Sequence, residues 1–116
     1  MAADPAHLST EINAIVSNSG NALCLSTASA CEIAMLQRLE RITLPDAPQR
    51  FIPEAHKQLG ITPLPLGFAT AIEAVMLPFH HRDPFDRIII AEAIREKMTV
   101  LTKDTVFNQY DVQILW

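Results

Sequence analysis

The order of apolar and polar positions along the chain predicts strands and helices in alternation. A short apolar run between turn residues is typical of a buried strand, and apolar residues three or four positions apart are typical of a helix with one buried face. The predicted strands are residues 22–26, 61–66, 99–102 and 112–115. The predicted helices are residues 8–19, 29–39, 50–59, 67–76 and 84–97, with a short turn or helix at 105–109. This alternation predicts an α/β fold in which helices flank a parallel sheet.

Proline and glycine residues mark the ends of these elements. The proline-containing stretch 44–48 is a connector, and Gly60 ends the helix before it. Pro63 and Pro65 make 61–66 an edge strand, because proline has no N–H to donate to a neighbouring strand. No repeat, low-complexity tract or linker divides the chain, so residues 1–116 are expected to form one domain.

Composition narrows the class of protein. Hydrophobic residues make up 49% of the 116 positions, enough for a packed core. No apolar run approaches the length of a membrane span and no secretory signal is visible, so we expect a cytoplasmic protein without a membrane segment.

Cys24 and Cys31 match no metal-binding spacing and are expected to be buried free thiols. A net charge of −4 argues against a passive nucleic-acid binder and is neutral for a metal-dependent nuclease.

The segment 80–87 runs directly into the most apolar helix of the chain. Asp83 is placed to cap this helix, Pro84 suits its first position, and Asp86 falls in its first turn. Carboxylates gathered at a helix start can hold a hard cation, which can act on a phosphate. The same spacing also suits a purely structural start of a buried helix.

Two further acids lie close to predicted strand ends. Glu32 follows the strand 22–26 and Asp104 follows the strand 99–102. Since sites on parallel sheets form at the carboxyl ends of strands, Glu32, Asp86 and Asp104 are expected to converge. Carboxylates that converge raise one another's pKa, so such a cluster implies Mg²⁺ or Mn²⁺. A structural alternative is that Ser29 and Glu32 form a capping box and Asp104 caps the turn after it.

Other kinds of site have weaker support. His80 and His81 have no cysteine or histidine partner at zinc spacing, although His81 is a candidate phosphate contact. With three glycines and no G-x-x-x-x-G-K or G-x-G-x-x-G motif, the chain has no phosphate-binding loop. No serine lies in a nucleophile elbow.

Several segments together resemble the PIN domain, and more closely the VapC-type toxin ribonucleases. The most specific is Leu77–Arg87 (LPFHHRDPFDR), followed by IAEA at 90–93. STASACEIA at 26–34, VLTKDTVF at 100–107 and VQILW at 112–116 also fit. The likeness covers essentially the whole chain.

This resemblance implies a PIN-like three-layer sandwich and an Mg²⁺- or Mn²⁺-dependent endoribonuclease. It implies a toxin–antitoxin pair, in which a homodimer is held inactive by a small cognate antitoxin. The metal-binding catalytic acids that it implies are Glu32, Asp86 and Asp104, with Asp83 and Thr102 as accessory residues. The basic residues beside these acids, which are candidate contacts to RNA phosphates or solvated surface charges, are Arg82, Arg87 and Lys103.

The chain departs from the family at its start. Family members begin with a short apolar strand that ends in an Asp, whereas the opening residues 3–9 resemble the loop after that strand, and Asp4 is a poor substitute for the Asp. We therefore expect the first, central strand to be missing, two strand edges to be unpaired, and metal binding to be weakened. One alternative is an inactive PIN-like protein that keeps dimer and antitoxin binding. Another is a structural domain whose acids lie more than about 10 Å apart, too far to share one Mg²⁺.

Overall fold

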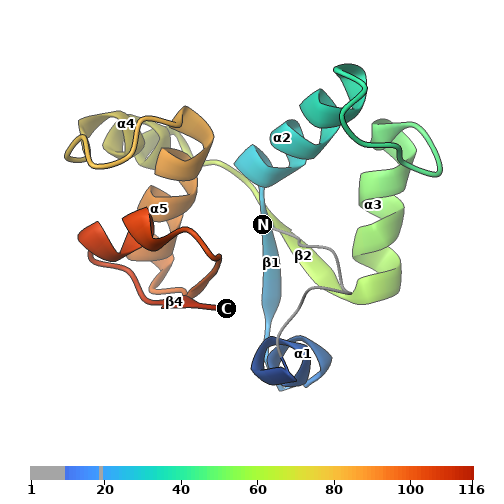
Figure 1. The fold of residues 1–116 in the computed structure, drawn as a ribbon, viewed down its shortest axis with the longest axis horizontal. Helices are drawn as coiled ribbons and strands as arrows, with labels where there is room; N and C mark the ends of the chain where they lie inside the picture. The colour runs from blue at the N-terminus through green and yellow to red at the C-terminus, as the bar shows by residue number, and fades with distance from the viewer. Residues whose placement is uncertain (1–9, 19) are drawn as a thin grey trace.

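One or two helices separate each strand from the next along the chain, in the order that the hydrophobic pattern predicts (Figure 1). The computed structural model describes residues 10–18 and 20–116. In chain order the elements are α1 (Thr10–Ser17), β1 (Leu23–Ser26), α2 (Thr27–Arg38), α3 (Pro48–Leu59), β2 (Ile61–Leu64), α4 (Phe68–Met76), α5 (Pro84–Glu96), β3 (Val100–Leu101), the 3₁₀ helix η2 (Thr105–Gln109) and β4 (Ile114–Leu115). The α/β class is therefore confirmed.

The strands form two separate parallel pairs. β1 pairs with β2, with Leu23 opposite Ile61, and β3 pairs with β4, with Val100 opposite Ile114. Within the described residues no ladder joins β1 to β3, so each pair is a two-stranded sheet of its own. β2 is an edge strand, as Pro63 predicts, and it ends at Leu64, before Pro65. In Figure 1, β1 and β2 stand between α2 and α3 on one side and the half of the molecule formed by α4, α5 and β4 on the other.

The start of α2 differs from the prediction. The helix begins at Thr27 because Ser26 caps it, and the Ser26 hydroxyl accepts the Ala28 N–H at 3.1 Å. Ser29 then lies inside the helix with its side chain buried, so the predicted capping box of Ser29 and Glu32 is wrong. Glu32 is consequently not needed for capping.

The other boundaries shift by a few residues at most. α3 begins at Pro48, two residues before the prediction, because proline suits the first helical position. Leu8, Ser9 and Ser19, at the ends of the first predicted helix, lie outside the described residues. α5 starts as predicted, with the Asp83 carboxylate accepting the Phe85 N–H, and ends at Lys97 in the left-handed conformation.

The main hydrophobic core lies between α5, η2 and the β3–β4 pair. Its buried members are Ile90, Ala93, Val100, Phe107 and Tyr110. This core fixes α5 and the strand that leads to Asp104 on one rigid unit. Of the helices that the structure describes, none combines the length and apolar character needed to cross a membrane.

Both cysteines are free but exposed, so the prediction of buried thiols is wrong. Cys24 lies in a groove beside β1 that no described strand fills. Cys31 lines an open cleft between α2 and α3.

Candidate metal centre

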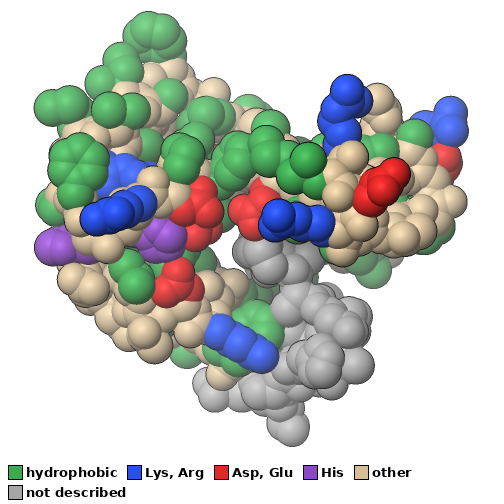
Figure 2. Space-filling model, turned by 45° about the horizontal axis from the view of Figure 1, so that its top comes forward, with side chains coloured by type: hydrophobic (Ala, Val, Ile, Leu, Met, Phe, Trp, Pro, Cys, Tyr) green, Lys and Arg blue, Asp and Glu red, His purple; other side chains and the backbone are tan. Residues whose placement is uncertain are grey.

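Acids far apart in the sequence meet at one end of the strands. Glu32, Asp83 and Asp86 form one group, and His81, Asp86 and Asp104 form another; within each group the candidate ligand atoms lie within 4.8 Å of one another. Asp86 belongs to both groups. Asp86 therefore lies close to both Glu32 and Asp104, although no group found among the described residues contains those two acids together. The closeness of each acid to Asp86 favours a shared cation site over acids scattered more than about 10 Å apart. Figure 2 shows acidic side chains gathered on this face with Lys and Arg side chains around them.

Helix starts present three of these acids. Asp83 caps α5, Asp86 lies in the first turn of α5, and Asp104 caps η2. Each capping acid uses one carboxylate oxygen: Asp83 Oδ1 accepts the Phe85 N–H at 2.9 Å, and Asp104 Oδ1 accepts the Val106 N–H at 3.0 Å. The cap leaves the second oxygen of Asp83 unused, whereas Asp104 Oδ2 lies 2.9 Å from His81 Nε2. Capping by itself is thus compatible with cation binding.

Thr102 positions Asp104. Its hydroxyl accepts the Asp104 backbone N–H at 3.1 Å, which closes the turn between β3 and η2. The predicted accessory residue therefore acts on the backbone that presents the carboxylate.

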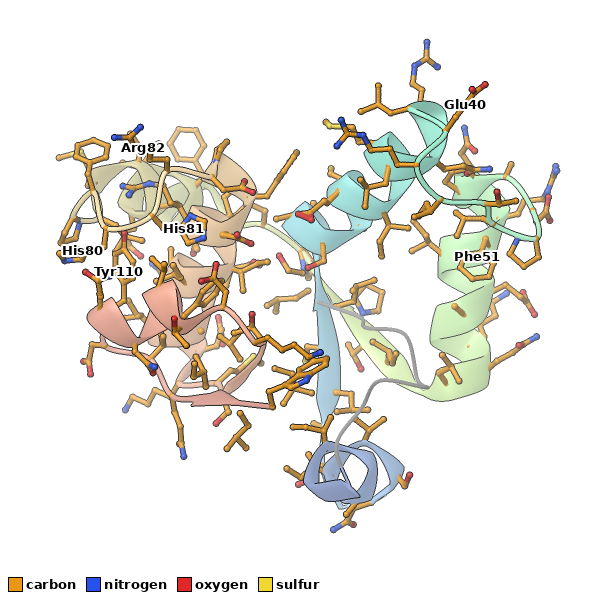
Figure 3. The ribbon with its side chains drawn as sticks, in the orientation of Figure 1. Glu40, Phe51, His80, His81, Arg82 and Tyr110 are labelled. Atoms are coloured by element: carbon orange, nitrogen blue, oxygen red, sulfur yellow. The ribbon has the colours of Figure 1, made fainter. Side chains whose placement is uncertain are left out.

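His81, which is labelled in Figure 3, contacts two of the acids. Its Nε2 is 3.0 Å from Asp86 Oδ2 and 2.9 Å from Asp104 Oδ2. Its Nδ1 accepts the Asp83 backbone N–H at 3.1 Å, which places the ring proton on Nε2. The imidazole N–H thus donates toward the two carboxylates, and the lone pair that a metal would need is used by Asp83. Sequence reasoning ranked His81 low; its position two residues before a helix cap was the available signal.

Burial and neighbouring charges disfavour the ionised form of the Asp86 carboxyl group. Burial is the main cause that raises its pKa to about 6; the charge of Asp83 adds to the effect, His81 opposes it, and Glu32 and Asp104 add smaller contributions. The pKa of Asp104 is instead lowered, first by the Val106 N–H and then by His81. Oxygen ligands that repel one another fit a hard divalent cation, which removes the repulsion.

The three basic residues predicted to contact RNA phosphates differ in their exposure to solvent. Arg82 and Lys103 are exposed, and the Lys103 ammonium lies 5.1 Å from the centre of the Trp116 ring. Arg87 is only 6% exposed, and its guanidinium donates to four backbone carbonyls. The prediction that Arg87 contacts RNA phosphate is corrected accordingly, because its N–H groups are used inside the protein. The carbonyls belong to Val75, Leu77, Pro78 and His81.

Tyr110 holds the loop that carries His81, a role that sequence analysis missed. Its hydroxyl accepts the backbone N–H groups of His80 at 3.0 Å and His81 at 2.8 Å, and donates to the Pro78 carbonyl at 2.6 Å. A single tyrosine near the end of the chain gives no local sign of these contacts, which span 29 to 32 positions.

We expect Tyr110→Phe to lower the free energy of unfolding by about 1–3 kcal/mol, because it leaves the backbone N–H groups of His80 and His81 without their acceptor. Urea denaturation measures this change. The matched control is Asn108→Ala, an exposed neighbour on η2, which should change stability by less than about 0.5 kcal/mol. Equal stability of Tyr110→Phe and the unaltered protein would show that water replaces the hydroxyl without cost.

Comparison with known proteins gives one result. The family model described as PIN domain matches residues 3–113. No curated protein and no solved structure matches the chain.

Proposed function

The chain belongs to the PIN domain family, whose members are generally nucleases, and on that basis we propose that it is a Mg²⁺- or Mn²⁺-dependent endoribonuclease toxin of a toxin–antitoxin pair. The observation that carries the proposal is that Asp86 groups with Glu32 and Asp83 and also with His81 and Asp104, with candidate ligand atoms within 4.8 Å of one another in each group. Such an arrangement is unfavourable without a cation, as the raised pKa of Asp86 indicates.

Glu32, Asp86 and Asp104 would hold the cation, with Asp83 as an accessory ligand. All four offer carboxylate oxygens, which are the ligands that Mg²⁺ and Mn²⁺ prefer. When bound, such a cation orients the scissile phosphate, offsets its charge and lowers the pKa of a water molecule. His81 would keep the Asp86 and Asp104 carboxylates oriented through its Nε2–H.

Arg82 and Lys103 are the proposed phosphate contacts. Both side chains are exposed and each lies next in sequence to an acid of the cluster. Cations beside an acidic centre would guide an RNA backbone toward it, since phosphate contacts position a nucleic acid without reading its sequence.

We expect Asp104→Asn to reduce Mn²⁺-dependent cleavage of a mixed-sequence RNA by about 100-fold, because a carboxylate that binds the cation is lost. The matched control is Asp111→Asn, an exposed acid outside the cluster, which should cleave at the unaltered rate. Cleavage is followed by gel electrophoresis at pH 7.5. RNA left intact by the unaltered protein in Mn²⁺, or equal rates for the two variants, would refute the proposed activity.

A second candidate function is a binding protein that keeps its partners and no longer cleaves RNA. An apolar row on α4 and the loop after it supports a protein partner, such as a second copy or a small antitoxin. These exposed side chains are Phe68, Ile72, Val75, Met76 and Phe79. Calorimetry with Mn²⁺ separates the two functions, since a nuclease should show saturable binding and an inactive site should not.

A further inference from the structure

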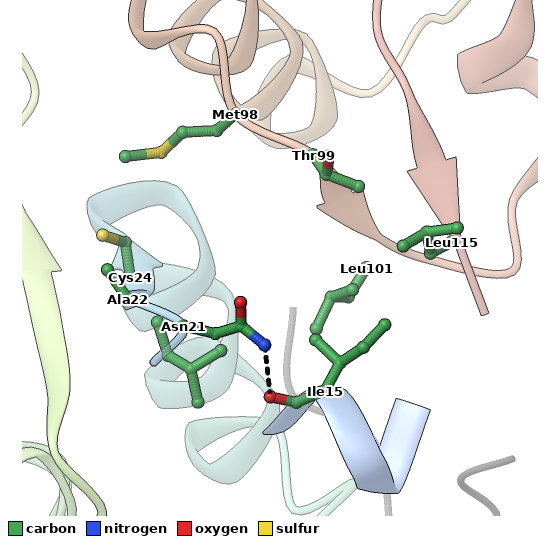
Figure 4. A pocket seen from close by; sticks show the side chains of 9 residues that line it. Ile15, Asn21, Ala22, Cys24, Met98, Thr99, Leu101 and Leu115 are labelled. Carbon is green, nitrogen blue, oxygen red and sulfur yellow. Dashed lines mark hydrogen bonds between the residues drawn. The ribbon is translucent and has the colours of Figure 1, made fainter. Parts of the chain in front are cut away.

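The single tryptophan of the chain, Trp116, lies at the end of the β3–β4 pair that leads to Asp104. Leu101 of β3 pairs with Leu115 of β4, and both side chains line the groove beside β1 (Figure 4). The Thr102 N–H donates to the Leu115 carbonyl at 3.0 Å, so the parallel ladder continues by one step. Trp116 therefore lies opposite Thr102.

This register brings Trp116 close to the candidate metal centre. Thr102 begins the turn to Asp104, whose backbone N–H its hydroxyl accepts at 3.1 Å. Neighbouring strands are about 4.8 Å apart and each residue adds at most about 3.6 Å, which keeps the backbones of Trp116 and Asp104 within about 12 Å of each other. A base next to a phosphate held at Asp104 can therefore reach the indole ring.

The packing of the main core does not use Trp116. Among the described residues, Val112 and Ile114 pack against that core, whereas Trp116 does not belong to it and keeps part of its surface exposed. A large aromatic ring gains free energy when a ligand covers its exposed surface. The position of Trp116 beside a candidate metal centre is thus typical of a ligand contact.

A cation lies beside the ring. The ammonium group of Lys103, which is exposed, lies 5.1 Å from the centre of the Trp116 ring. Proteins bind single-stranded nucleic acid with this combination, because the ring stacks on a base and the cation attracts the backbone. In a duplex the faces of each base are already covered by its neighbours, so the ring fits an unpaired base.

We propose that Trp116 stacks on an unpaired RNA base beside the phosphate held at the candidate metal centre, while Lys103 attracts the adjoining phosphate. Every base has a π-face, so this contact selects single-stranded RNA and not one particular sequence. The inference rests on the proposed function for its RNA ligand, but it concerns binding and not cleavage.

Two octamers that differ only in their bases test the stacking. One is an adenylate octamer, and the other has the same backbone with hydrogen in place of each base, so both carry the same charge. Fluorescence anisotropy of labelled octamers measures their affinity at low ionic strength, with EDTA present so that the RNA stays intact. We expect the unaltered protein to bind the adenylate octamer about tenfold more tightly, the effect of one stacked base. The unlabelled adenylate octamer should also quench the emission of Trp116, which has no other tryptophan beside it in the chain.

Three variants separate the aromatic ring from a structural role. Trp116→Leu should bind the two octamers with affinities within about twofold of each other, whereas Trp116→Phe keeps a ring and should retain a preference of at least about threefold. The matched control is Phe68→Leu on α4, which removes an aromatic side chain that is 87% exposed and should keep the full preference.

The inference is overturned if the unaltered protein binds neither octamer or both equally, or if Trp116→Leu keeps the preference. It is also overturned if a stable duplex of the same length quenches Trp116 as strongly as the adenylate octamer does. RNA cleavage in Mn²⁺ would still support the proposed nuclease after any of these results. A preference that is lost in Trp116→Leu, together with RNA left intact in Mn²⁺, would support the stacking and refute the nuclease instead.

Discussion

Replacing Asp86 with asparagine is expected to abolish Mn²⁺ binding and RNA cleavage, and at the same time to make the metal-free protein more stable at neutral pH. Asp86 is the acid shared by both groups of the candidate metal centre, so its loss removes a ligand from each of them. We expect cleavage to fall by at least about 100-fold. The gain in stability has a separate origin. The variant has no carboxylate at position 86, so it avoids the free-energy cost of ionising that group in the folded protein.

The sign of the stability change follows from the pKa of Asp86. Folding raises it from 3.8 to about 6, so the folded state holds the proton more tightly than the unfolded state. The stability that this provides is fully present below pH 3.8 and is lost as the pH rises through about 6. A rise of this size corresponds to at most about 3 kcal/mol, and solvent screening reduces the effect to about 1–2 kcal/mol. Asparagine cannot ionise, so the variant does not incur this loss at pH 7.5.

Thermal unfolding with and without Mn²⁺ measures both effects. Without metal, Asp86→Asn should unfold several degrees above the unaltered protein at pH 7.5, and the difference should vanish near pH 4. Mn²⁺ should stabilise the unaltered protein more at pH 7.5 than at pH 5, because the ligands must be deprotonated, and should not stabilise the variant. Asp111→Asn is the control for a general change in charge. A variant that is less stable than the unaltered protein without metal would contradict the argument.

Replacing Arg87 with methionine is expected to destabilise the fold by about 3–5 kcal/mol, because four backbone carbonyls lose one buried, charged donor together. The Arg87 guanidinium donates hydrogen bonds both to the end of α4 and to the loop before α5, and so holds the two segments together. Its bonds to Leu77 and Val75, at 2.6 and 3.0 Å, also place a positive charge at the carboxyl end of α4. The same group lies 4.8 Å from the centre of the Phe79 ring.

Two further variants separate this structural role from loss of charge. Arg87→Lys keeps the charge, but one ammonium cannot reach the carbonyls on both sides, so most of the stability should still be lost. Arg95→Met, on the same helix, removes only an exposed ion pair with Glu73 and should cost less than about 1 kcal/mol. Urea denaturation compares the three. If Arg87→Met folded normally and only bound RNA less tightly, the original expectation of a phosphate contact would be restored.

Much of the fold could be predicted because its signals are local. Asp83 caps α5 through the N–H of Phe85, two residues away, and Gly60, after α3, has the positive φ of 67° that glycine adopts readily. The error at α2 has a local cause too. Ser26 and Ser29 were both suitable caps, and the end of β1 at Ser26 decided between them.

The sequence by itself determined the order of the helices and strands, their parallel class and the placing of the acids at helix starts or after strand ends, because periodicity and capping depend on residues a few positions apart. Only the tertiary structure decided that His81 donates to Asp86 and Asp104, that Arg87 is turned inward, and that a groove separates β1 from β3. The contact between His81 and Asp104 joins positions 23 residues apart, and that between Ser26 and Glu92 joins positions 66 residues apart. Their formation depends on how the helices pack against each half-sheet, which no local pattern encodes.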